Sequence, residues 1–151
     1  MSTTSSFETS GGGAEAARPL IVAGVDGSET SMEALRWAGR QAQLTGARLR
    51  VIEAWSPVDR TPMSPHIDFE AEVREALQRT IDLITKDFPG IDVSSAAVTG
   101  HPSRVLIDAT SDADLLVVGS RGRGAFTGML LGSVSQHCVQ QAHCPVVVVR
   151  R

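Results

Sequence analysis

The sequence has few cysteines, no long apolar run and no excess of positive charge, and each shortage excludes a class of protein. Two cysteines, Cys138 and Cys144, are too few for the disulfide framework of a small secreted domain. No apolar segment is long enough to cross a bilayer. A net charge of −3 argues against a nucleic-acid binder, which would usually carry a basic face. The start of the chain has no basic flank before an apolar stretch, so we expect no signal peptide and a cytoplasmic location.

The length and composition predict one globular domain with a tail in front of it. With 151 residues, of which 42% are hydrophobic, the chain is long enough to bury a core. Residues 1–17 are rich in Ser, Thr and Gly and lack apolar periodicity, so we expect a disordered tail there. The folded domain is expected over residues 18–151.

Strand and helix patterns alternate along that domain. Apolar runs predict strands, and helical spacing of apolar residues predicts helices. The expected strands are residues 19–25, 48–55, 91–98, 115–118 and 145–149. The expected helices are residues 28–45, 69–88, a segment that starts near Pro102, and 132–142. The third strand is the least apolar and is therefore expected at a sheet edge. The alternation predicts an α/β fold, a doubly wound parallel sheet that binds its ligand where the winding reverses.

The most informative stretch is the glycine-rich segment that follows the fourth strand. It reads Gly119, two residues, Gly122, nine residues, then Gly132-Ser133. A strand, a glycine-rich loop and a helix start present backbone N–H groups to an anion, and Arg121 and Arg123 add positive charge. A plain turn is the alternative interpretation.

Two common phosphate-binding motifs do not fit this segment. The Walker motif needs a lysine at the end of the loop, whereas the only lysine of the chain is Lys86. The dinucleotide motif fails because Thr127 replaces its third glycine. If the first and fourth strands flank the reversal of the sheet, Asp26 and the glycine loop meet in one crevice.

Several motifs together resemble the universal stress protein family, in its ATP-binding branch. They are the glycine spacing above, Val25-Asp26-Gly27-Ser28, Val98-Thr99-Gly100-His101-Pro102, Leu130-Leu131-Gly132-Ser133 and His143-Cys144-Pro145-Val146. The resemblance implies a Rossmann-like sheet of the adenine-nucleotide alpha-hydrolase type, with strand order 3-2-1-4-5. It also implies a stress-response sensor or regulator that depends on bound ATP. A phosphate cradle beside Asp26 could hold Mg²⁺ together with the ATP.

The resemblance also implies which residues contact the nucleotide. Gly24, Val25 and Asp26 would line the adenosine, and Ala54 would approach the base. Val118 and Gly119 would lie under the ribose. The phosphates would be held by Ser120, Arg121, Gly122, Arg123, Gly124, Ala125, Gly132, Ser133 and Val134, with Ser135 as a further contact.

Alternative functions remain open at this stage. The same pocket would suit cyclic AMP, and a dimeric scaffold or chaperone would need no nucleotide. ATP hydrolysis is expected to be weak at most, because no general base is evident and the Gly-x-Ser-x-Gly motif is absent. Asp26 could serve only as a helix cap. The two His-Cys pairs do not have the spacing of a structural zinc site, so no metal ligands are expected.

The last strand predicts an interaction between copies of the chain. Residues 146–149 are four valines, and in the implied strand order they form an unprotected edge. We expect a homodimer through this strand. A helix or tail that covers the edge is the alternative.

Overall fold

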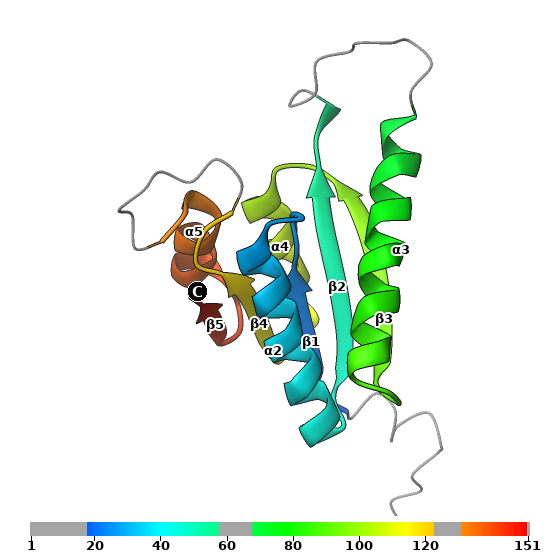
Figure 1. Ribbon diagram of the computed structural model, residues 1–151. Helices are drawn as coiled ribbons and strands as arrows, with labels where there is room; N and C mark the ends of the chain where they lie inside the picture. Colours follow the sequence, from blue (N-terminus) through cyan, green and yellow to red (C-terminus); the bar gives the residue numbers. More distant parts are fainter. Residues whose placement is uncertain (1–17, 58–67, 123–130, 151) are drawn as a thin grey trace, which may run out of the picture.

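The computed structural model describes residues 18–57, 68–122 and 131–150, in which five parallel strands form one sheet (Figure 1). Their order is β3-β2-β1-β4-β5, which confirms the predicted topology. The strands are β1 (Leu20–Gly24), β2 (Arg48–Trp55), β3 (Asp92–Thr99), β4 (Leu115–Gly119) and β5 (Val146–Val149). The predicted tail at residues 1–17 lies outside the described residues.

Within these ranges, four α-helices connect the strands, as predicted. They are α2 (Glu29–Thr45), α3 (Phe69–Asp87), α4 (Pro102–Ala109) and α5 (Ser133–Gln141). A short 3₁₀ helix, η2 (Thr110–Asp112), follows α4 and was not predicted. None of the helices in the described ranges is long and apolar enough to span a bilayer.

The helices form a layer on each face of the sheet, so that the fold has two hydrophobic clusters (Figure 1). On one face, Leu49 and Val51 of β2 pack with Leu35 of α2 and Leu77 of α3. The opposite face contains a cluster to which α4 and α5 contribute Leu106 and Cys138. Because β1 and β4 are covered on both faces, they are apolar without alternation.

The reversal of the sheet lies between β1 and β4. From β1 the chain continues outward through β2 to β3, and α4 then returns it to β4 on the other side of β1. The two strands pair in parallel, with Ala23 opposite Val117. Their carboxyl ends therefore lie side by side at the place where doubly wound sheets bind ligands.

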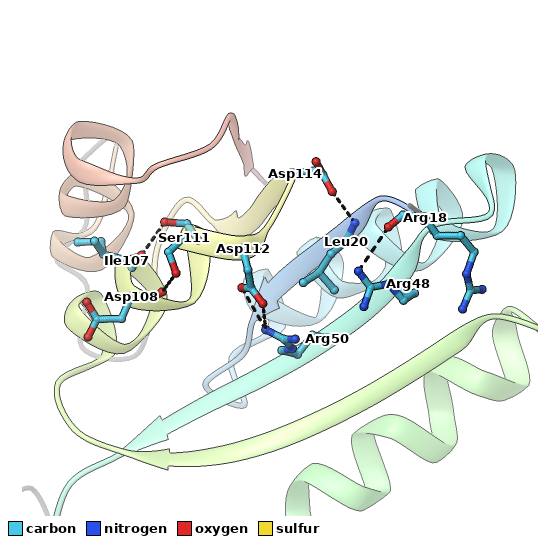
Figure 2. A network of polar contacts seen from close by, with 10 residues as sticks. Arg18, Leu20, Arg48, Arg50, Ile107, Asp108, Ser111, Asp112 and Asp114 are labelled. Carbon is cyan, nitrogen blue, oxygen red and sulfur yellow. Dashed lines mark hydrogen bonds and ion pairs between the residues drawn. The ribbon is translucent and has the colours of Figure 1, made fainter. Parts of the chain in front are cut away.

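The amino-terminal end of the sheet is closed by polar contacts (Figure 2). The backbone N–H of Leu20 donates to Asp114 Oδ2 at 2.8 Å, and the N–H of Asp114 donates to the carbonyl of Leu20 at 2.9 Å. Beside them, Arg50 of β2 forms an ion pair with Asp112 at 3.4 Å. Asp114 thus joins the start of β1 to the start of β4 through both its side chain and its backbone N–H.

Replacing Asp114 with alanine should lower the free energy of unfolding by about 1–2 kcal/mol, because the Leu20 N–H loses a charged acceptor in a partly buried position. Urea denaturation at neutral pH measures this change. Asp114→Asn keeps an acceptor oxygen and should cost less than the alanine variant. Asp108→Ala is the matched control, since the Asp108 side chain is exposed and its carbonyl makes the contact with Ser111. Equal stability of Asp114→Ala and the control would contradict this role.

Candidate functional site

Asp26 lies in the tight turn between β1 and α2. Its Oδ1 accepts a hydrogen bond from the N–H of Ser28 at 2.9 Å, and Gly27 between them has a φ of 81°. Ser28 in turn caps α2, since its side chain accepts from the N–H of Ser31. Asp26 therefore stands before the helix cap, and the capping itself is done by Ser28.

The second carboxylate oxygen of Asp26 faces the glycine loop that follows β4. A Cβ added to Gly122 would lie 2.5 Å from Asp26 Oδ2. The sequence predicted that Asp26 and this loop meet, and the structure brings them together. The absence of a side chain at position 122 is what allows this approach.

Other glycines of the predicted site serve the packing of helices. A Cβ on Gly119 would lie 2.9–3.1 Å from the side chain and backbone of Thr30 in α2. A Cβ on Gly24 would lie 2.7 Å from Leu106 of α4. Neither glycine is among the described glycines with positive φ, which are Gly27, Gly46, Gly90 and Gly100. Gly119 and Gly24 thus let α2 and α4 approach the carboxyl ends of the strands.

Ser120 joins the two ends of the glycine loop. Its N–H donates to Val149 of β5 at 2.8 Å, while its carbonyl accepts from the N–H of Gly132 at 2.6 Å and from Ser135 Oγ at 2.9 Å. The start of α5 is thereby fixed beside the end of β4.

Two groups that were expected at the phosphates have partners within the protein in this structure. The N–H of Gly132 was expected to face the phosphates, but in this structure it is occupied by the Ser120 carbonyl. The hydroxyl of Ser135 was expected to contact a phosphate, but it is only 2% exposed and bonds to Ser120 and Gly132. Both groups hold the loop together from inside.

The start of α5 carries the anion-binding potential of the site. Within the described residues, α2, α3 and α4 each have a side chain that caps the first turn, namely Ser28, Asp68 and His101. Helix α5 begins after Gly132 without such a cap. Its first-turn N–H groups, together with the helix dipole, favour a negative charge at this position.

Arg121 and Gly122 lie next to this helix end. A Cβ on Gly132 would be 3.4 Å from the Cα of Arg121 and 3.6 Å from the N of Gly122. Both residues are exposed, as is Ser133 at the first position of α5. The backbone of Arg121, an uncapped helix start and the Asp26 carboxylate thus lie within one short region. An anion with hydroxyl groups nearby fits these three features.

The remaining predicted residues are partly within the described structure. Val25 and Val118 are buried, and Val25 continues the sheet through its N–H to Ile52. Ala54 is partly exposed near the carboxyl end of β2, and Val134 packs against the second hydrophobic cluster. Arg123, Gly124 and Ala125 lie outside the described residues.

Burial disfavours ionisation of both cysteines. Burial raises the pKa of the Cys138 thiol to about 11. Burial also raises the pKa of Cys144, with a further contribution from Asp114. Both thiols are therefore protonated at neutral pH, which is unfavourable for a nucleophile or a metal ligand. No group of three His, Cys, Asp or Glu side chains in the described ranges is arranged to hold a metal ion.

Sequence reasoning missed two residues that shape the site, Thr30 and Ser31. Thr30 packs against Gly119, and Ser31 bonds to the backbone of the Asp26 turn. The signal for Ser31 was present, because a serine occupies a position of α2 whose helical neighbours on the same face are Ala34 and Leu35. Thr30 gave no such signal, since its contact depends on how closely α2 approaches β4.

Comparison with known proteins shows a family to which this chain is similar over almost all of its described length. The model of the universal stress protein family matches residues 19–150. Universal stress protein Rv2005c of Mycobacterium tuberculosis is 38% identical over 136 residues, which cover 88% of this chain and 45% of that relative. The chain thus spans slightly less than half the length of this relative.

Solved structures show the same fold. A universal stress protein in complex with cAMP matches with a TM-score of 0.70 and 28% identity. The match covers 88% of this chain and 97% of that protein's chain. Universal stress protein UspA from Lactobacillus plantarum has a TM-score of 0.74 and 22% identity, and covers 89% of this chain and 99% of its own.

Proposed function

Because the chain belongs to the universal stress protein family, we propose that it binds an adenine nucleotide, in the first place ATP, at the carboxyl ends of β1 and β4. The observation that supports this most is the uncapped start of α5 beside Arg121 and Gly122, across from Asp26. The ATP would serve as the signal that a stress-response sensor or regulator reads.

Different residues would bind the anionic part and the polar part of the proposed ligand. The first-turn N–H groups of α5, at Ser133 and Val134, would donate to phosphate oxygens, and Arg121 would neutralise their charge. The Asp26 carboxylate would accept from a hydroxyl of the ribose or from the base, or would hold Mg²⁺ beside the phosphates. Gly122 leaves room for both, since a side chain there would occupy the space between Asp26 and the loop.

The proposal is one of binding, with ATP hydrolysis weak at most. Hydrolysis of ATP needs a group that orients and deprotonates water at the terminal phosphate. Asp26 is the carboxylate that the structure places at the glycine loop, and its Oδ1 already accepts from the backbone of Ser28. A regulatory role in the cytoplasm, governed by whether the site is occupied, follows from this proposal.

A second candidate ligand is cyclic AMP. It is favoured by the similarity to the universal stress protein whose structure contains cAMP. Cyclic AMP carries one phosphate with a single negative charge, whereas ATP carries three phosphates. The helix start and Arg121 offer N–H donors and positive charge to more than one phosphate, which favours ATP.

A third candidate is a scaffold or chaperone that works without nucleotide. Our proposal also includes a homodimer, and a scaffold would use the same one. The dimer would form through the four valines of β5, which form one edge of the sheet and are half-buried along their length. Such an edge pairs readily with a second copy of itself. Sedimentation equilibrium at micromolar concentration should give the mass of two chains, and a monomer alone would contradict the dimer.

Thermal melts with ATP, AMP and cyclic AMP test the proposed function. A ligand at 100 times its dissociation constant should raise the free energy of unfolding by about 2.7 kcal/mol, and we expect the largest increase with ATP. Equal stabilisation by ATP and cyclic AMP at equal concentrations would favour the cyclic nucleotide, since the additional phosphates would then contribute nothing. No stabilisation by any of the three would favour the scaffold.

A further inference from the structure

Ser31 is a polar residue in an apolar position. It is 4% exposed and lies on the buried face of α2, which otherwise carries Ala34, Leu35 and Ala38 nearby. A buried hydroxyl is unfavourable unless its hydrogen bonds are satisfied. The partners of Ser31 therefore indicate what the serine does at this position.

The Ser31 hydroxyl connects the helix with the turn in front of it. Its Oγ donates to the carbonyl of Ser28 at 2.9 Å and accepts from the N–H of Asp26 at 3.3 Å. Its backbone N–H donates to the Ser28 hydroxyl at 3.2 Å, which is the ordinary cap of the helix. The bond to Asp26 is additional to the cap, because Asp26 lies outside α2.

Asp26 directly follows Val25, whose backbone still bonds to the sheet. The N–H of Val25 still donates to Ile52 of β2, at 2.9 Å. One residue later, the N–H of Asp26 turns to Ser31. The backbone is thus held by the sheet at Val25 and by the Ser31 hydroxyl at Asp26.

The hydrogen bond from the Asp26 N–H to Ser31 also affects the orientation of the Asp26 carboxylate. With its backbone held by Ser31, Asp26 directs Oδ1 to the N–H of Ser28 and Oδ2 toward Gly122. A Cβ at position 122 would be only 2.5 Å from Oδ2, so a small rotation of the turn changes the space between Asp26 and the loop.

We infer that Ser31 is a positioning residue of the nucleotide site, whose hydroxyl fixes the Asp26 carboxylate in the orientation that the ligand requires. This inference rests on the proposed function, since the ligand of Asp26 is the proposed nucleotide. Ser31 does not touch the nucleotide and acts through Asp26.

Calorimetric titration of ATP into four variants separates positioning from mere folding. Ser31→Ala should weaken ATP binding about fivefold to tenfold, the effect of one lost hydrogen bond. Ser31→Thr, which keeps the hydroxyl, should bind ATP within about twofold of the wild type. In the Asp26→Asn background, Ser31→Ala should change the affinity by less than about twofold, because the group that it positions is already impaired.

Ser103→Ala is the matched control. Ser103 is also a nearly buried serine in the first turn of a helix, α4, where its hydroxyl bonds to His101. This variant should lose a similar amount of stability while it retains the wild-type affinity for ATP. An equal loss of affinity for Ser31→Ala in both backgrounds, or no loss at all, would overturn the inference.

Amide hydrogen exchange without nucleotide provides a readout that does not depend on binding. Ser31→Ala should accelerate exchange of the Asp26 N–H at least about tenfold, and Ser103→Ala should leave it unchanged. A wild-type protein that binds no adenine nucleotide would refute the proposed function, and the exchange rate alone would then decide whether Ser31 fixes Asp26. Unchanged exchange in Ser31→Ala would refute the positioning role even if ATP binds.

Discussion

Replacing Gly122 with glutamate should remove most of the stabilisation by ATP and leave the fold intact. The new Cβ would lie 2.5 Å from Asp26 Oδ2, so a second carboxylate would enter the space beside Asp26 and repel the phosphates. Two like charges about 4 Å apart interact by about 1 kcal/mol in bulk water and about 4 kcal/mol near a protein surface, and an intermediate value predicts ATP binding weaker by about 100-fold. Thermal melts at increasing ATP concentration measure the loss.

The fold should tolerate this change because Gly122 is exposed and is not among the described glycines with positive φ. Ser94→Glu is the matched control, since it adds the same charge at an exposed position of the edge strand β3. The control should retain the full ATP effect. Full stabilisation of Gly122→Glu by ATP would show that the nucleotide binds elsewhere.

Replacing Gly119 with valine, in contrast to Gly122→Glu, should cause a large loss of folding stability. Its Cβ would lie 3.0 Å from the carbonyl carbon and 3.1 Å from the carbonyl oxygen of Thr30, and backbone atoms do not rotate away as a side chain does. Helix α2 would have to move from β4, at a cost of about 2–3 kcal/mol, or a decrease in Tm of about 5–10 °C. Urea denaturation and calorimetry of the variant measure the two quantities.

Thr30→Ser tests the cause of that loss. It removes the methyl carbon that lies 2.9 Å from the new Cβ and leaves the backbone contacts in place. Added to Gly119→Val, it should therefore restore only part of the stability. Complete rescue would show that the Thr30 side chain alone is responsible, and a Gly119→Val protein as stable as the wild type would contradict the close packing of α2.

These two glycines show how far the sequence could predict the site. Gly119 and Gly122 belong to one spacing motif, and from the sequence both were expected to expose backbone N–H groups. In the structure Gly119 accommodates Thr30 and Gly122 accommodates Asp26. The motif predicted where the loop lies, but the role of each glycine depends on which atom of another element faces it.

The fold was more predictable than the site for a physical reason. Apolar runs, Ser28 as the cap of α2 and Gly46 with φ of 72° at its end are local signals, and the structure confirms them. Hydrogen bonds such as Gly132 to Ser120 join residues on both sides of a loop. Their existence depends on the exact placement of α5 against β4, which no local pattern encodes.

The buried serines illustrate the same limit. Ser31 and Ser135 are both hydroxyl residues near a helix start, and each was compatible with capping, ligand binding or loop support. The structure assigns Ser31 to the Asp26 turn and Ser135 to the carbonyl of Ser120. Because both hydroxyls are almost fully buried, any contribution that they make to ligand binding would be indirect.

An NMR titration that follows each backbone amide while ATP and Mg²⁺ are added tests the nucleotide site most directly. We predict that the largest chemical shift changes occur at Gly122, Ser133 and Val134, together with Asp26. The amides of Leu20 and Asp114, at the opposite end of the sheet, should remain unchanged. Shift changes confined to that opposite end, or none at the start of α5, would contradict nucleotide binding between β1 and β4.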